Sequence, residues 1–288
     1  HTPIESARAG REEAKRVNAD CAIAIGGGST IGLGKAIALD SSLPILAIPT
    51  TYAGSEMTPI LGITENGIKT TLRDGRMLPK TVIYDADLTL TLPAKLSATS
   101  GMNAIAHSVE ALYAKEANPI ISLMAEESIR VLADALPKIT RNSQDLAARS
   151  DAQYGAWLAG GCLGAVGMAL HHKLCHTLGG SFNLPHAETH TIILPHAVAY
   201  NALAAEQAMV SISRALGLGP KLEAARGLFE LVKAIDAPLA LKDIGMQESD
   251  LDRAAEIATT NPYYNPRPIE RGPIRKLLDA AFFGRRPS

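Results

Sequence analysis

The sequence predicts two domains, an α/β domain with a parallel sheet over residues 1–92 and an all-helical domain over residues 93–288. Two short apolar runs, 21–25 and 44–48, each end in a loop rich in glycine or hydroxyl side chains. Such runs are typical of strands that are buried on both faces of a parallel sheet. From Pro93 onward, alanine and leucine recur at helical spacing and β-branched clusters are few.

The composition limits the classes of function. An apolar content of 47% and a charged content of 20% fit a soluble globular enzyme. The net charge of -1 argues against a nucleic-acid partner, and no apolar run reaches the ~18 residues of a membrane span. The three cysteines have no paired spacing and no secretory signal is present, so we expect a cytoplasmic protein without disulfides.

The first loop of the α/β domain has the residues of a phosphate cradle. A helix is predicted over 4–18, and the strand 21–25 leads through a glycine turn into a helix over about 30–39. Glycines let the backbone approach a phosphate, and the start of the helix stabilises its charge. A tight turn without a ligand is the alternative. Because the domain opens on a helix, we expect its N-terminus to be truncated.

The second loop, residues 49–56, follows the strand 44–48. Two such loops at the carboxyl ends of neighbouring strands predict a nucleotide site. The runs 59–64 and 67–72 predict a hairpin around Asn66-Gly67, and 81–84 predicts another strand. Lys69 is long enough to reach a phosphate there, although an exposed strand lysine is the common alternative. The candidate cofactor-binding residues are Gly26, Gly27, Gly28, Ser29, Thr50, Thr51, Ser55 and Lys69.

Seven helices are predicted in the second domain. Their ranges are 97–114, 119–136, 145–170, 173–179, 188–204, 206–216 and 221–235. The run 261–268 contains three prolines, which forbid a helix, so we expect an extended loop.

Histidine is concentrated between residues 171 and 196, where six of the chain's eight histidines lie. His172 and His176 are four apart and so share one helix face. The break before His186 suits a turn that returns a third imidazole to the same place. Imidazole ligates metals and transfers protons near neutral pH, so we predict an active site here rather than scattered surface residues. His190 and His196 are expected to be structural.

Five segments resemble the iron-containing (group III) alcohol dehydrogenases: GGGS at 26–29, PTT at 49–51, GSE at 54–56, SGMNAIAH at 100–107 and HHKLCHTLGGSFNLPH at 171–186. The resemblance covers almost the whole chain. It implies a Rossmann-like domain joined to a helical domain, the dehydroquinate synthase-like fold, with the active site in the cleft between them. It also implies NADH or NADPH as cofactor and a homodimer. Complete chains of the family are longer at the N-terminus, in agreement with a truncated first domain.

One position departs from the family's metal site. Metal-using relatives hold a divalent ion with an aspartate and three histidines. The histidine positions match His107, His172 and His186, but the aspartate position holds Asn103. A neutral amide is a weaker ligand than a carboxylate and leaves a dication uncompensated. We therefore expect a vestigial site and an enzyme that works without a metal ion.

The segments MNAIAH and ALHHKLCH resemble family members that reduce the double bond of an unsaturated keto dicarboxylate, 4-oxohex-2-enedioate, to 3-oxoadipate during the breakdown of aromatic compounds. Hydride added β to the ketone gives an enolate, which donor side chains stabilise and an acid protonates. An iron- or zinc-dependent alcohol or polyol dehydrogenase is the alternative, and an inactive nucleotide-binding relative is a third. The catalytic candidates are His107, His172, Lys173, His176 and His186; the substrate candidates are Asn103, His171, Lys173, Tyr263, with Tyr264 beside it, and Arg267.

Overall fold

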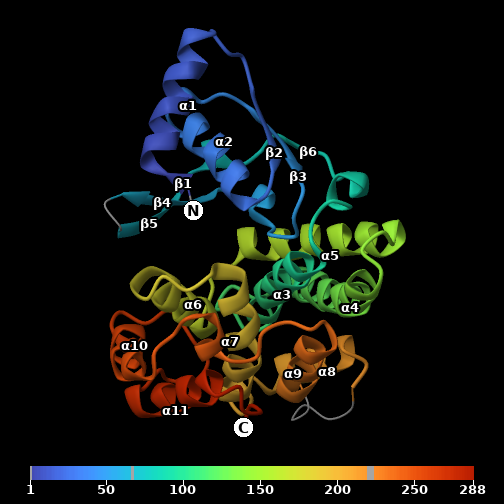
Figure 1. Ribbon diagram of the computed structural model, residues 1–288, viewed down its shortest axis with the longest axis vertical. Helices are drawn as coiled ribbons and strands as arrows, with labels where there is room; N and C mark the ends of the chain where they lie inside the picture. Colours follow the sequence, from blue (N-terminus) through green and yellow to red (C-terminus); the bar gives the residue numbers. More distant parts are fainter. Residues whose placement is uncertain (1, 66–67, 219–223) are drawn as a thin grey trace.

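The computed structural model describes residues 2–65, 68–218 and 224–288. Every strand in this part of the chain lies before residue 83, and from residue 94 onward the regular elements are helices (Figure 1). The predicted order of an α/β part followed by an all-helical part is confirmed. None of the helices in these residues has the length and apolar character that a membrane crossing needs.

The α/β part contains two three-stranded sheets, ordered β2-β3-β6 and β1-β4-β5. The first is parallel and the second contains the predicted antiparallel hairpin of β4 and β5. The turn predicted at residues 66–67 lies outside the described residues. The elements are β1 (Thr2–Pro3), α1 (Ile4–Arg16), β2 (Ala22–Gly26), α2 (Gly28–Ser41), β3 (Ile45–Pro49), η1 (Ser55–Met57), β4 (Ile60–Glu65), β5 (Ile68–Arg73), η2 (Gly75–Met77), β6 (Thr81–Val82) and η3 (Ala86–Thr89).

Strands β2 and β3 run in parallel register from Ala22 opposite Ile45 to Gly26 opposite Pro49. Their carboxyl ends therefore lie side by side, and the loops that follow them meet. The expectation that β2 is buried on both faces is wrong for these residues, because Ile23 is 61% exposed and Ile25 is 55% exposed. β2 is the edge strand of its sheet in the described residues, so only β3 flanks it.

The helical part begins with α3, a helix buried on almost every side. The predicted helix 145–170 is wrong at its end, since α5 stops at Ala165 and a separate helix, α6, begins at Leu170. Helices α10 and α11 were not predicted. The helices are α3 (Ala94–Ala111), α4 (Pro119–Arg141), α5 (Leu146–Ala165), α6 (Leu170–Ser181), α7 (His186–Asn201), α8 (Glu206–Ala215), α9 (Ala224–Ala234), α10 (Leu251–Thr259) and α11 (Arg271–Phe282), with short 3-10 turns η5 (Leu241–Ile244) and η6 (Glu248–Asp250).

Capping and packing explain this layout. Asn118 and Asp145 accept hydrogen bonds from the first turns of α4 and α5, so each helix begins where its cap stands. One core joins α3, α4, α5, α8 and α9, and a second joins α6, α7, α10 and α11 (Figure 1). Helix α7 contributes to both cores, which places it at the centre of the helical part.

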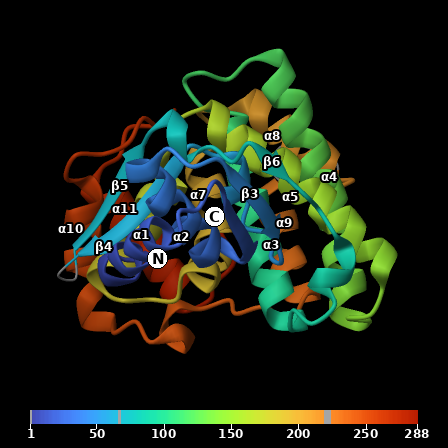
Figure 2. The ribbon, with the colours of Figure 1, turned by 90° about the horizontal axis from the view of Figure 1, so that it is seen from above.

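A buried arginine on α5 fixes the junction of the two parts. The Arg149 guanidinium donates to the carbonyl oxygen of Leu92 at 3.0 Å, to Ser97 Oγ at 2.8 Å and to the Tyr52 hydroxyl at 3.3 Å. It therefore ties the loop after β3 and the segment before α3 to one helix. Seen from above, the α/β elements lie over the helical part, and α5 contacts η1 (Figure 2).

Candidate active site

The first loop forms a ridge of backbone without side chains between β2 and α2. Gly26 has a φ of 151°, a conformation that favours glycine, and Gly27 stands at the N-cap of α2 with no side-chain cap. The amide of Thr50 donates to the Gly26 carbonyl at 3.1 Å, so the second loop lies against the first. A Cβ on Gly27 would approach Thr51 Cγ2 to 3.0 Å, and one on Gly28 would approach the Ala53 methyl to 3.6 Å. The uncapped helix start and bare backbone fit the diphosphate of a nicotinamide nucleotide.

The other candidate cofactor-binding residues lie in different surroundings. Ser29 lies in the first turn of α2, while Ser55 Oγ accepts a hydrogen bond from Lys35 at 3.2 Å. Lys69 lies opposite Thr64 in the hairpin, and its side chain lies outside the described part of the chain. The structure thus brings the two loops together but does not place Lys69 at them.

The histidines of α3, α6 and α7 form one cluster of rings. His172 lies at its centre, with ring centroids 4.9 Å from His107, 5.2 Å from His171, 4.9 Å from His190 and 6.0 Å from His176. The predicted sharing of one face by positions 172 and 176, and the return of the chain after residue 183, agree with this arrangement. His186 joins the cluster through His190, whose ring centroid lies 4.3 Å away.

A buried carboxylate, Glu110 on α3, supports His172. Its Oε2 lies 2.7 Å from His172 Nδ1 and accepts from the amide of Ala169 at 2.7 Å, while its Oε1 accepts from the amide of His171 at 2.6 Å. Burial raises the pKa of Glu110 to about 7, against the backbone donors that lower it. Because both oxygens accept from the backbone, the carboxylate receives the Nδ1 hydrogen of His172.

The rings of His107 and His172 form a buried pair whose nitrogens face each other. His172 Nε2 and His107 Nδ1 lie 2.9 Å apart. Burial and then the neighbouring His172 lower the pKa of His107 well below the usual histidine range, against a backbone hydrogen bond with Ala53 that acts to raise it. One neutral ring can donate this hydrogen bond to the other, with the direction set by the tautomers, or both nitrogens can bind a cation.

Burial lowers the pKa of three rings in the cluster well below the usual histidine range. This holds for His107, His171 and His190, and neighbouring imidazoles add to the effect of burial in each case. A protonated ring is therefore disfavoured at these three positions, while His172 has the Glu110 carboxylate as its partner.

Asn103 lies one turn before His107 and is 6% exposed. Its Oδ1 has no hydrogen-bond partner among the described residues. A buried carbonyl oxygen without a donor is unusual, and it marks a place where a substrate hydroxyl, a water or a cation would be stabilised. Asn103, predicted to contact substrate, therefore has an oxygen available for that role.

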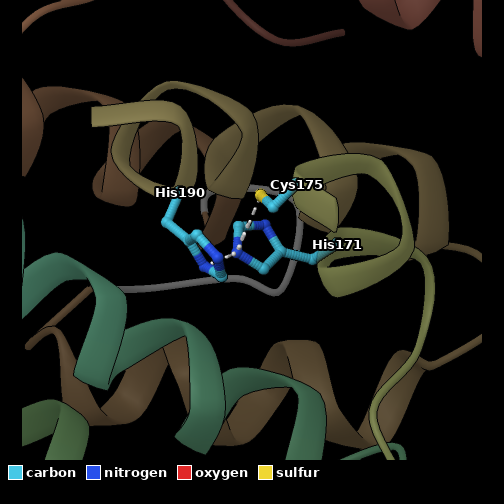
Figure 3. A group of neighbouring side chains, drawn as sticks. All are labelled: His171, Cys175 and His190. Carbon is cyan, nitrogen blue, oxygen red and sulfur yellow. Dashed lines mark hydrogen bonds between the residues drawn. The ribbon is translucent and has the colours of Figure 1, made fainter. Parts of the chain in front are cut away.

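Three possible metal ligands, His171, Cys175 and His190, lie together between α6 and α7. His171 Nε2 lies 2.9 Å from His190 Nδ1 and 3.7 Å from Cys175 Sγ, and the three side chains point toward one another (Figure 3). Imidazole and thiolate are ligands of zinc and related metals, and these atoms all lie within 4.8 Å of one another. The outer nitrogens, His171 Nδ1 and His190 Nε2, have no partner in the described residues, whereas ligating histidines normally donate there.

The remaining substrate candidates divide into two groups. The Tyr263 hydroxyl lies 3.0 Å from His176 Nδ1, and Lys173 Nζ lies 5.6 Å from the centre of the Tyr263 ring. Burial, followed by the charge of Glu110, raises the pKa of Tyr263. Arg267 instead donates to the Tyr200 carbonyl at 3.0 Å and stacks on the Tyr200 ring, so the structure engages it away from the histidines.

Three buried groups near the site were missed by sequence reasoning. Glu110 stands three residues after His107, and with Asn103 it completes an i, i+4, i+7 face that the sequence already contained. His190 was expected to be structural, but it contacts four other histidines. Lys35 lies beneath the second loop, and nothing in the local pattern distinguished it from a surface lysine.

Two family models match the chain, and together they show the class of protein. "Iron-containing alcohol dehydrogenase" matches residues 1–86, and "Fe-containing alcohol dehydrogenase family, C-terminal" matches residues 97–282. The chain belongs to the iron-containing alcohol dehydrogenase family.

Named relatives narrow this class. The chain is 62% identical over 288 residues to maleylacetate reductase of Burkholderia cepacia and 55% identical over 287 residues to that of Sphingobium indicum, covering all of this chain and 81% of each relative. The crystal structure of maleylacetate reductase from Agrobacterium tumefaciens matches with a TM-score of 0.96 and 54% identity, over 100% of this chain and 81% of that chain. A 1,3-propanediol oxidoreductase matches with a TM-score of 0.90 and 30% identity, over 96% and 80%.

The expectation of an enzyme without a metal ion finds no support in these comparisons, since the family is described as iron-containing. The donor types suit a divalent ion, because imidazole nitrogens of His107 and His172 face each other and the buried Asn103 oxygen has no partner in the described residues. Three imidazoles and a solvent molecule suffice to hold zinc in other proteins. The site has Asn103 where metal-using relatives have an aspartate. This substitution predicts weaker metal binding, not the absence of a metal ion.

Proposed function

We propose that this chain reduces the carbon–carbon double bond of maleylacetate (4-oxohex-2-enedioate) with NADH or NADPH, giving 3-oxoadipate. The support is the named relatives at 51% to 62% identity over the full length of the chain. The observation that carries the proposal is the buried chain of contacts from Glu110 through His172 to His107, because it holds two imidazoles in fixed positions at the centre of the histidine cluster.

The reaction needs a hydride and a proton at different carbons. A bound nicotinamide would supply the hydride at the alkene carbon β to the ketone, which would leave the substrate as an enolate. The histidines of the cluster donate hydrogen bonds to the enolate oxygen, and a proton drawn from solvent through the cluster ends on the α carbon. Asn103 contacts the substrate through its side-chain amide, and Lys173 with Tyr263 binds a substrate carboxylate. The two loops, through Gly26–Ser29, Thr50, Thr51 and Ser55, bind the nucleotide.

Asn103, His107, His172 and His186 are the residues that would hold a divalent ion. Such an ion would supply a Lewis acid that polarises the ketone oxygen. The same residues would support the second candidate function, a metal-dependent alcohol or polyol dehydrogenase, which the 30% identity to a 1,3-propanediol oxidoreductase favours.

One assay separates the two functions. Nicotinamide oxidation is followed with maleylacetate and, separately, with simple aldehydes, each with and without a chelator. We expect turnover of maleylacetate to exceed that of aldehydes by orders of magnitude. Good turnover of aldehydes beside none of maleylacetate would contradict the proposal. Loss of aldehyde turnover after chelation, with recovery on adding iron or zinc, would establish the alcohol dehydrogenase.

The proposal extends to the domains, assembly and location of the enzyme. We propose two domains that meet at residue 92 and a homodimer. We also propose that the enzyme acts in the cytoplasmic breakdown of aromatic compounds, where it binds a small dicarboxylate and neither a nucleic acid nor a membrane. The family resemblance supports the dimer, and the near-zero net charge of -1 agrees with the absence of nucleic acid. Sedimentation equilibrium measures the mass of the assembly, and a monomer at micromolar concentration would contradict the dimer.

A further inference from the structure

A lysine is completely buried beneath the second nucleotide loop. Lys35 lies on α2, two turns after the glycine ridge, and is 0% exposed. Its Nζ donates to the carbonyl oxygens of Ser55 and Ile60 at 2.5 and 2.8 Å, and it also contacts Thr58 Oγ1 at 3.0 Å and Ser55 Oγ at 3.2 Å. Its acceptors all belong to residues 55–60, so one side chain on α2 holds the whole of that segment.

The burial of this charge is expensive. Burial lowers the pKa of Lys35 to about 7, although the nearby Glu56 carboxyl acts to raise it. Glu56 is itself 1% exposed and accepts from the Tyr84 hydroxyl at 2.9 Å. An apolar side chain would fill this space with less desolvation, so the contacts of Lys35 are better explained by the geometry they impose than by stability.

The segment that Lys35 holds is packed from the opposite side by α5. A Cβ on Gly54 would lie 3.0 Å from Gly160 Cα, and a Cβ on Gly160 would lie 2.6 Å from the Gly54 carbonyl oxygen. Backbone therefore meets backbone with no room for a side chain. The segment contains Ser55, a proposed nucleotide contact, and follows directly on Gly54.

We propose that Lys35 is a positioning residue for the nicotinamide nucleotide, which fixes residues 55–60 between α2 and α5 so that the two nucleotide loops keep one spacing. Lys35 itself does not contact the nucleotide, because its side chain has no exposed surface. Its effect reaches the nucleotide through Ser55 and the backbone of the second loop. The inference rests on the proposed use of NADH or NADPH but not on the identity of the reduced substrate.

The test is a direct titration of NADH and of NADPH by fluorescence, with no dicarboxylate present. Lys35→Met removes the ammonium and keeps a long side chain. We expect the Kd of the preferred nucleotide to rise about tenfold or more, corresponding to about 1.4 kcal/mol. In steady-state assays, KM for the nucleotide should rise while kcat at saturating nucleotide and KM for maleylacetate stay near the wild-type values, a split that general loss of folded protein would not produce.

Two further variants make the test decisive. Lys80→Met is the matched control, because Lys80 is exposed in the same part of the fold, and its Kd should equal that of the wild type. Thr58→Val removes one acceptor of the ammonium with little change in shape, and we expect a rise in Kd of about threefold. This second variant serves if Lys35→Met does not fold.

The outcomes separate this inference from the proposed function. A Kd for folded Lys35→Met within about twofold of that for Lys80→Met would overturn the positioning role, as would an unchanged Kd for Thr58→Val where Lys35→Met is unfolded. Tight nucleotide binding by the wild type without turnover of maleylacetate would contradict the proposed function alone. Failure of the wild type to bind either nucleotide would overturn both.

Discussion

Replacement of Glu110 by glutamine tests whether the buried carboxylate holds His172 in the position that catalysis needs. The substitution keeps the size of the side chain and removes its charge. Both carboxylate oxygens accept a backbone amide, at 2.7 and 2.6 Å, so the new NH₂ group must face one of those N–H donors. If the NH₂ group takes the Oε2 position, His172 also loses the acceptor that lies 2.7 Å from its Nδ1, and otherwise it keeps a neutral acceptor in place of a charged one.

The size of the effect follows from these two losses. A hydrogen bond to a charged group contributes about 1.5–3 kcal/mol, and a buried donor left without a partner costs about 1–3 kcal/mol. If about 2.7 kcal/mol of this sum is lost from the stabilisation of the transition state, kcat decreases about a hundredfold. The remainder lowers the free energy of unfolding.

The assay is the steady-state rate of maleylacetate reduction at saturating nucleotide, together with denaturant unfolding of each variant. Glu116→Gln is the matched control, because the Glu116 carboxylate accepts a single backbone hydrogen, from Gly167 at 3.0 Å, and its amide oxygen can do the same. We expect Glu116→Gln to keep the wild-type kcat. A folded Glu110→Gln protein with kcat within about threefold of the wild type would refute the role given to this carboxylate.

Three further predictions concern pH, metal and packing. Burial lowers the pKa of His196 to about 4, so the unfolded chain takes up a proton near pH 6.5 that the folded chain refuses until about pH 4. This group therefore removes about 3 kcal/mol from the free energy of unfolding as the pH falls from 6.5 to 4. In His196→Gln, the free energy of unfolding measured in urea should fall by about 3 kcal/mol less over this pH range, and an equal fall in the two proteins would contradict the prediction. Asn103→Asp should raise the affinity for Zn²⁺ in calorimetry by about tenfold or more without improving maleylacetate reduction, and unchanged metal binding would show that the charge argument is wrong. Gly160→Ala forces a Cβ to 2.6 Å from the Gly54 carbonyl and should lower stability by about 2 kcal/mol, whereas Gly161→Ala meets only the flexible end of Met124 at 2.9 Å; similar melting temperatures for the two variants would contradict this packing.

The order of the strands and helices could be predicted from the sequence because the signals for these elements are local. The apolar runs at 21–25 and 44–48 correspond to β2 and β3, and the start of α4 at Pro119 follows from its Asn118 cap. The end of α5 and the two last helices were missed for a physical reason. Residues 166–169 break the helix within a continuous small-residue pattern, and α10 and α11 are short helices whose apolar faces have meaning only against α6 and α7.

The histidine cluster was predictable as a group, but its internal order was not. Spacing placed His172 and His176 on one face, yet the hydrogen bond between His107 and His172 joins residues 65 positions apart. Glu110 escaped notice because a glutamate within an amphipathic helix is usually solvated, and only the packing of α3 shows it to be buried. Arg267 was expected to bind substrate, and the sequence could not show that Tyr200 would engage it instead.

The contacts of Arg149 have a consequence for how the molecule comes apart. This guanidinium belongs to a helix of one part, and its acceptors include the Tyr52 hydroxyl of the other. Melting the α/β part alone would break this hydrogen bond of a buried charged group, which contributes about 1.5–3 kcal/mol. The two parts should therefore behave as a single cooperative unit, with one calorimetric transition whose van't Hoff and calorimetric enthalpies agree, rather than as two domains that melt in succession.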